Sequence, residues 1–175
     1  MFQVKFPPSP GESLTSYMSR ISFENGISIL SLWNDIKKVG SPNPQRPDLS
    51  LIDLLPDSVL DVGQLSMLTG VPGRQLLRGT FNNIFHLFNN GGQSAKSRFV
   101  KGILRSEVHY CPQCLLEDPS IDLLWRVNDI YCCVKHSCLL QQACLHCKHP
   151  ILVNNLATPG VCPSCFEELG AEVNS

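Results

Sequence analysis

Apolar residues near the N-terminus recur every three or four positions, the spacing that places them on one face of an α-helix. The pattern predicts a first helix over residues 11–25, with Ser13 as its N-cap and Gly26 in a left-handed conformation after its end. A second helix is predicted over residues 28–38. The apolar positions of these two helices are Leu14, Tyr17, Met18, Ile21, Ile29, Leu32, Trp33 and Ile36.

A helix-turn-helix is predicted over residues 61–81. Its first helix begins near Asp61, Gly70 supplies the turn, and Pro72 begins the second helix. The apolar residues that face the core are Leu65, Leu68, Leu76 and Leu77. The same pattern suits two packed helices of a bundle with no role in reading DNA, and the spacing leaves both interpretations open.

Two further stretches are predicted to be connections. Residues 40–47 contain three prolines and residues 89–97 contain a Gly-Gly pair, compositions typical of loops. Beyond Tyr110 the pattern changes, because Cys-x-x-Cys occurs three times, starting at Cys111, Cys144 and Cys162. We therefore expect a mainly α-helical region with a helix-turn-helix over residues 1–106. It is followed by two zinc-ribbon modules with short β-hairpins, over residues 107–141 and 142–175.

The composition favours a folded protein of the cytosol. Hydrophobic residues make up 43% of the chain and charged residues 17%. The apolar stretches fall far short of the ~20 residues that a membrane span needs, and residues 1–10 show no signal-peptide pattern. All nine cysteines lie between Cys111 and Cys165. In a reducing compartment this clustering indicates metal binding and not a disulfide scaffold.

The cysteine spacing predicts two zinc ions, each with four ligands. Pairs with a two-residue spacer turn both side chains toward one ion, and two pairs complete a tetrahedron. Eighteen residues separate the two pairs of the first site and fourteen separate those of the second. The predicted ligands are Cys111, Cys114, Cys133 and His136 for the first ion, and Cys144, Cys147, Cys162 and Cys165 for the second. Such closed shells have no position for a substrate or water, so structural zinc is expected.

Two cysteines remain outside these sets. Cys132 is an alternative ligand to Cys133, since a three-residue spacer to His136 is also feasible, although the two-residue spacer of Cys133 forms the tighter turn. Cys138 stands beside two leucines, and we interpret it as a buried structural thiol.

Charge is distributed unevenly along a chain whose net charge is −1. Residues 70–106 contain six basic residues and no acidic one. We predict that these residues contact nucleic acid or an acidic face of a partner. They are Arg74, Arg78, Lys96, Arg98, Lys101 and Arg105. Arg74 and Arg78 are four positions apart and therefore share one helix face. The alternative is a solvated basic surface that has no partner.

Several sequence strings together resemble the TniQ/TnsD family. In the cysteine-rich part they are Tyr110-Cys-Pro-Gln-Cys-Leu-Leu-Glu-Asp118, Trp125-Arg126, Cys133-Val-Lys-His-Ser-Cys-Leu-Leu140 and Cys144-Leu-His-Cys147. Nearer the N-terminus they are Pro10-Gly-Glu-Ser-Leu-Thr-Ser-Tyr-Met-Ser-Arg20, Asn25-Gly26 and Leu65-Ser-Met-Leu-Thr-Gly70. The resemblance implies a helix-turn-helix region followed by zinc ribbons, and a role in selecting the target of DNA transposition.

The resemblance also implies partners. Family members link a target-recognising module to an AAA+ ATPase regulator of the TnsC type, which recruits the transposase. Longer members carry a further C-terminal domain, and the chain ends ten residues after Cys165. It is therefore similar to the short TniQ form of CRISPR-associated transposons, where a Cas effector and its guide RNA choose the site. We expect contacts with the regulator, the effector, DNA and RNA. The alternative is a protein that recognises its DNA target by itself.

Two other classes of protein fit the sequence less well. A RING-type adaptor shares the order of ligand pairs, but seven residues separate His136 from Cys144, which is too many for cross-braced pairing. A zinc nuclease would need acids around an open metal, and the acids near the first site are Asp118, Asp122 and Asp129, for which the sequence suggests no basic partner. There is no Gly-rich phosphate loop. We therefore predict a protein that is not an enzyme.

Overall fold

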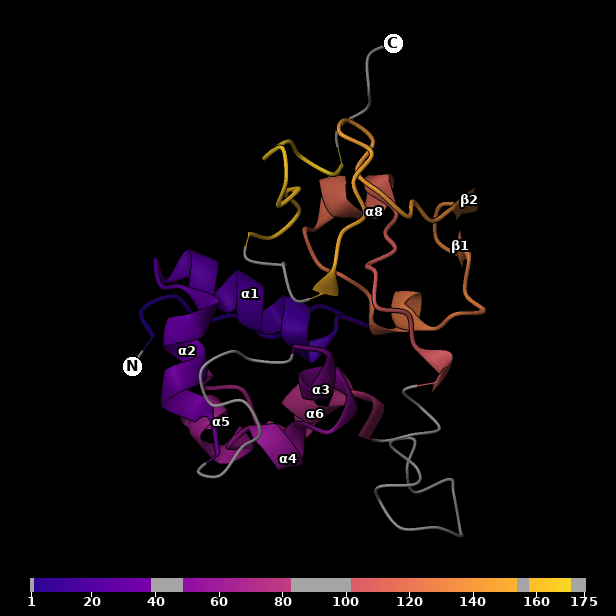
Figure 1. Cartoon of the computed structure of the whole chain (residues 1–175). Coiled ribbons are helices and arrows are strands. Elements are labelled where there is room, and N and C mark those ends of the chain that lie inside the picture. Colours follow the sequence, from indigo (N-terminus) through magenta and orange to yellow (C-terminus); the bar gives the residue numbers. More distant parts are fainter. Residues whose placement is uncertain (1, 39–48, 83–101, 154–157, 171–175) are drawn as a thin grey trace, which may run out of the picture.

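Short helices form the N-terminal part of the molecule, and the cysteine-rich segments lie beside them (Figure 1). The structure is a computed structural model that describes residues 2–38, 49–82, 102–153 and 158–170. The helices of the N-terminal part are α1 (Leu14–Glu24), α2 (Ile29–Ile36), α3 (Leu49–Leu54), α4 (Pro56–Val59), α5 (Val62–Thr69) and α6 (Gly73–Arg78). Helix α1 packs against α2, α3 and α6, so it is the central element of this part.

The caps predicted for the first two helices are confirmed. The Ser13 hydroxyl accepts the Ser16 N–H at 3.1 Å, and the Ser28 hydroxyl accepts the Ser31 N–H at 3.1 Å. Each cap provides an acceptor for one of the unpaired N–H groups of a first helical turn. Gly26 has a φ of +65°, the left-handed value expected after the end of α1.

The helix pair predicted over residues 61–81 is also present. The Asp61 carboxylate caps α5 by accepting the Gln64 N–H at 2.9 Å. Gly70 ends α5 with a φ of +76°, and α6 begins directly after Pro72 and packs against α5. The fold class is therefore the predicted one, a mostly helical N-terminal part followed by small cysteine-rich modules.

The remaining elements are short. Helices α3 and α4 were not predicted from the sequence, and the predicted loops over residues 40–47 and 89–97 lie outside the described residues. The cysteine-rich part contains α8 (Pro112–Glu117), the 3₁₀ helix η2 (Leu123–Arg126) and a hairpin of β1 (Cys132–Cys133) and β2 (Cys138–Leu139). The hairpin is antiparallel and pairs Cys133 with Cys138.

A continuous hydrophobic core joins the helical part to the cysteine-rich part. It includes Leu14 and Trp33 from the first helices, Tyr110 and Ile151 from the later segments, and Cys144. Described residues from all three predicted segments, 1–106, 107–141 and 142–175, therefore pack into one interior. Among the described residues, no helix is both long and apolar enough to cross a bilayer.

A buried ion pair also crosses this boundary. Arg126, in η2, donates from Nη1 to Asp53 Oδ2 at 2.8 Å, and both side chains are almost wholly buried. The other carboxylate oxygen of Asp53 accepts the Thr15 N–H in the first turn of α1, also at 2.8 Å. Asp53 thus places a negative charge at the N-terminus of α1, where the helix dipole favours it.

We expect Arg126→Met to destabilise the protein by about 3–5 kcal/mol, because the variant leaves the Asp53 carboxylate buried without its cation. The double variant Arg126→Met/Asp53→Asn should recover most of this loss, since the amide is neutral and still accepts the Thr15 N–H. Urea unfolding at a fixed excess of zinc measures both values. Equal free energies of unfolding for the single and double variants would contradict the view that the unpaired Asp53 carboxylate causes the loss.

Candidate metal centres

The first cluster of ligands is assembled by α8 and the hairpin. Cys111 precedes α8, Cys114 lies within it, Cys133 lies on β1, and His136 lies in the turn between the strands. The Sγ atoms of Cys111 and Cys114 lie 3.3 and 3.2 Å from His136 Nδ1. The Sγ atoms of Cys114 and Cys133 are 3.6 Å apart. One helix and one hairpin therefore direct four ligand atoms toward a single point.

The second cluster is assembled by two turns, one that carries Cys144 and Cys147 and one that carries Cys162 and Cys165. Cys144 Sγ lies 3.7 Å from Cys165 Sγ, and Cys147 Sγ lies 3.7 Å from Cys162 Sγ. These contacts pair each cysteine with one from the other turn. In both clusters, all four ligand atoms lie within 4.8 Å of one another.

The backbone shows why the two-residue spacers work. Among the described residues, the non-glycine positions with positive φ are Ser137, Lys148 and Phe166, at +51°, +60° and +63°. Each directly follows the second ligand of a pair, namely His136, Cys147 or Cys165. The left-handed residue closes each of these turns. In the last one, the Phe166 N–H donates to the Cys162 carbonyl at 3.0 Å. The Cys111–Cys114 pair differs, because α8 spaces its ligands instead.

The distances within each cluster fit a zinc ion. With Zn–S bonds of about 2.3 Å, neighbouring sulfurs of a tetrahedron lie about 3.8 Å apart. The observed Sγ–Sγ contacts between pairs are 3.6–3.7 Å. The donors are soft sulfur and imidazole nitrogen with no carboxylate among them. Each cluster can therefore hold one zinc ion in a closed shell, which is the structural kind of site that the spacing predicts.

All eight predicted ligands come together, and the neighbouring cysteine is excluded. Cys133 is 3% exposed and belongs to the first cluster, whereas Cys132 is exposed and lies outside it. This geometry favours the tighter spacer, which places Cys133 in the cluster. Cys138 is half-buried and not fully buried as predicted, and its Sγ lies 3.5 Å from Cys111 Sγ. Its place opposite Cys133 in the hairpin explains that proximity.

The clusters pair their ligands sequentially along the chain. Cys111 and Cys114 join Cys133 and His136, and the four later cysteines form the second set. A RING domain interleaves its pairs instead, so the structure contradicts that alternative and agrees with zinc ribbons.

A carboxylate outside the first cluster orients its histidine. Glu117 Oε1 lies 3.1 Å from His136 Nε2, while Nδ1 faces the cysteines. Glu117 also pairs with Lys135, and the Lys135 hydrogen bond, followed by that of His136, holds the pKa of Glu117 below its ordinary value. A carboxylate on the outer nitrogen fixes the ring orientation and tautomer of a metal-bound histidine. Sequence reasoning missed Glu117, although its place three residues after Cys114 was visible.

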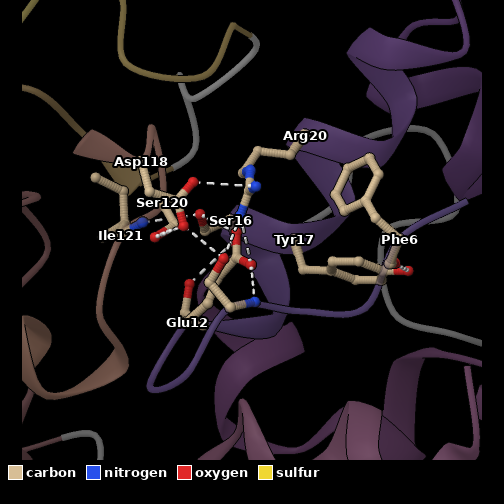
Figure 2. A network of polar contacts seen from close by, with 10 residues as sticks. Phe6, Glu12, Ser16, Tyr17, Arg20, Asp118, Ser120 and Ile121 are labelled. Carbon is tan, nitrogen blue, oxygen red and sulfur yellow. Dashed lines mark hydrogen bonds and ion pairs between the residues drawn. The ribbon is translucent and has the colours of Figure 1, made fainter. Parts of the chain in front are cut away.

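A polar network connects α1 to the first cluster (Figure 2). Arg20 Nη1 donates to Glu12 Oε2 at 2.9 Å, and Nη2 pairs with Asp118 Oδ1 at 3.0 Å. The Ser16 hydroxyl donates to Glu12 and accepts the Ile121 N–H. Asp118 therefore has a basic partner that was not obvious from the sequence, because Arg20 is distant in sequence and adjacent in the fold.

The basic residues of the 70–106 stretch have different surroundings. Arg74 and Arg78 are exposed on α6. Arg105 is 8% exposed. Its guanidinium donates a hydrogen bond to the Asn128 carbonyl and lies 5.4 Å from the centre of the Tyr131 ring. The Arg105 guanidinium is thus engaged within the molecule, and its contact with a partner stays a prediction. Lys96, Arg98 and Lys101 lie outside the described residues.

Comparison with known proteins identifies one family. The model of the TniQ family matches residues 4–140, which include the helical part and the first cluster. The second cluster lies beyond the matched range. A comparison with curated proteins finds no match.

We expect the purified protein to contain two zinc ions, and Cys133→Ser to reduce this to one, because the first shell then lacks a thiolate. The matched control is Cys132→Ser, which removes the adjacent exposed thiol and should retain both ions. Elemental analysis after gel filtration measures the zinc content. Loss of an ion from the Cys132 variant alone would reverse the ligand assignment.

Proposed function

Because the chain belongs to the TniQ family, we propose that it links a target-recognising complex to an AAA+ regulator of the TnsC type on DNA. Family membership itself supports the broader statement that this is a transposition-associated, DNA-binding adaptor. The target-recognising partner we propose is a Cas effector with its guide RNA. The observation that carries the proposal is the family match over the helical part and the first metal cluster.

A non-enzymatic role agrees with the chemistry of the two metal centres. TniQ proteins are typically adaptors without catalytic activity. Both ligand sets here consist of four protein side chains, so a bound zinc ion has no open position for a substrate. The acids near the first cluster have structural partners, since Asp118 pairs with Arg20 and Glu117 pairs with Lys135 and His136. ATP hydrolysis then belongs to the regulator.

The surface that supports DNA contact is the outer face of α6. Arg74 and Arg78 are exposed there, and neither forms an ion pair within the described part of the chain. No acidic residue occurs in the sequence between residues 70 and 106 to neutralise them. Two guanidinium groups on one helix face suit phosphates of a DNA backbone, which provide affinity without sequence specificity.

A protein that recognises its DNA target by itself is the alternative function. The observation in its favour is the α5–α6 pair joined at Gly70, which has the form of a helix-turn-helix. The two functions differ in sequence preference. An adaptor that contacts phosphates binds unrelated duplexes equally, whereas an autonomous reader prefers one site by a large factor.

We expect Arg74→Glu/Arg78→Glu to weaken binding to duplex DNA and to make its salt dependence shallower. Loss of two phosphate contacts reduces the slope of log K against log salt by about 2. Fluorescence anisotropy with a labelled duplex, with and without the regulator, measures both quantities.

The control is Lys38→Glu, which reverses the charge of an exposed lysine on another segment. Both variants should keep two zinc ions. If the Arg74/Arg78 variant folds, retains its zinc and supports transposition at the normal rate, this helix face has no role in the adaptor.

A further inference from the structure

A groove of about 580 Å³ separates the segment before α1 from the first cysteine-rich module. One wall is apolar, and it includes Leu124, Trp125 and Val134. Val134, at the tip of the hairpin, is 91% exposed, and Leu124 is 55% exposed. Such apolar side chains beside a concave surface are characteristic of a place where another chain binds.

The groove is also lined by carboxylates. The carboxylates that line the groove are Glu12, Glu117, Asp118 and Asp122, and the basic residue on its lining is Lys135. Three of these four carboxylates form ion pairs with basic side chains. Arg20 pairs with Glu12 and Asp118, and Lys135 pairs with Glu117. Because Arg20 is shared by two of these carboxylates, the groove keeps a net negative charge, to which Asp122 contributes without a cation of its own among the described residues.

Asp122 is the carboxylate left without a cation. Its Oδ1 accepts the Leu124 N–H at 2.8 Å and caps η2. No described residue forms an ion pair with it or donates a hydrogen bond to Oδ2. Oδ2 lies against Gly11, where an added Cβ would be only 2.8 Å away. The Asp122 side chain is therefore held between the backbone of Leu124 and the backbone of Gly11.

We propose that this groove binds an extended segment of a partner protein, with a Lys or Arg side chain paired to Asp122 and a neighbouring apolar side chain on Leu124 and Val134. The inference rests on the proposed adaptor function, and it assigns protein binding to a face other than α6. Charge complementarity decides the occupant, because an acidic or nucleic-acid ligand would meet an unpaired carboxylate.

The electrostatic surroundings of Asp122 agree with this assignment. Burial raises the pKa of its carboxyl above the ordinary value, and no cation opposes that effect. A bound ammonium or guanidinium would stabilise the ionised form. The apolar wall adds binding energy next to the ion pair, and the partial exclusion of water strengthens the pair itself.

The test uses the full-length zinc-loaded protein and a phage-displayed library of random peptides. Enriched sequences should carry Lys or Arg beside an apolar residue. A fluorescein-labelled copy of the most enriched peptide then serves as the probe in anisotropy measurements. Asp122→Asn should raise its Kd by about tenfold or more, since the amide preserves the cap of η2 and removes the charge.

Two controls define the interpretation. Asp129→Asn removes an exposed carboxylate that does not line the groove, and Leu139→Ser removes an exposed apolar side chain on β2 that also lies outside it. Both should bind the peptide as the wild type does, whereas Val134→Ser should bind it more weakly. The proposal is overturned if no peptide is enriched, if enriched peptides lack a basic residue, or if Asp122→Asn binds normally.

The outcome is separate from that of the DNA-binding test. Asp122 lies in the cap of η2, whereas Arg74 and Arg78 lie on α6. If the groove binds no peptide but the α6 variant still weakens DNA binding, this inference is rejected and the adaptor function is retained. The reverse pattern rejects DNA bridging by α6 and retains the groove.

Discussion

Four thiolate or imidazole ligands around one ion form the interaction on which the cysteine-rich part depends. The ligands come from positions far apart in sequence, and in both clusters the first member of each pair is buried while the second is half-exposed. An ion bound to either cluster would therefore lie at the edge of the hydrophobic core, into which Cys111, Cys133, Cys144 and Cys162 pack. Bound metal therefore adds cohesion to that of the apolar packing in these segments.

The same core extends into the helices, and polar contacts fix how the two parts meet. Arg20 joins Glu12 before α1 to Asp118 after α8 (Figure 2), and Arg126 joins η2 to Asp53 on α3. The Glu12, Arg126 and Asp53 charges are buried, and buried charges are costly unless their partners remain in place. The consequence is an adaptor in which α6 and the groove are held on one body, a suitable arrangement for binding two partners at once.

The elements that were predictable are those with a strong local signal. The caps at Ser13 and Ser28 and the left-handed Gly70 follow directly from residue type, and the ligands follow from repeated two-residue spacers. Helices α3 and α4 have no such signal, because they are short and separated by a single residue before Pro56.

Contacts between distant residues were harder to anticipate. The pairing of Arg20 with Asp118 depends on how α1 meets α8, and the burial of Arg105 depends on Tyr131 and Asn128. A basic residue in a basic stretch looks available for DNA until its tertiary partners are known. Likewise, the positive φ values after His136, Cys147 and Cys165 are imposed by the turns, since Ser, Lys and Phe show no local preference that would reveal them.

Zinc K-edge X-ray absorption on the intact protein tests the central claim most directly, because it reports the atoms bound to the metal. The two shells contain seven sulfur ligands and one imidazole nitrogen in total. The account predicts an average first shell of four ligands with sulfur and nitrogen in that ratio, at Zn–S distances of about 2.3 Å. A first shell containing oxygen, or a sulfur count that requires Cys132 or Cys138 as an additional ligand, would contradict it.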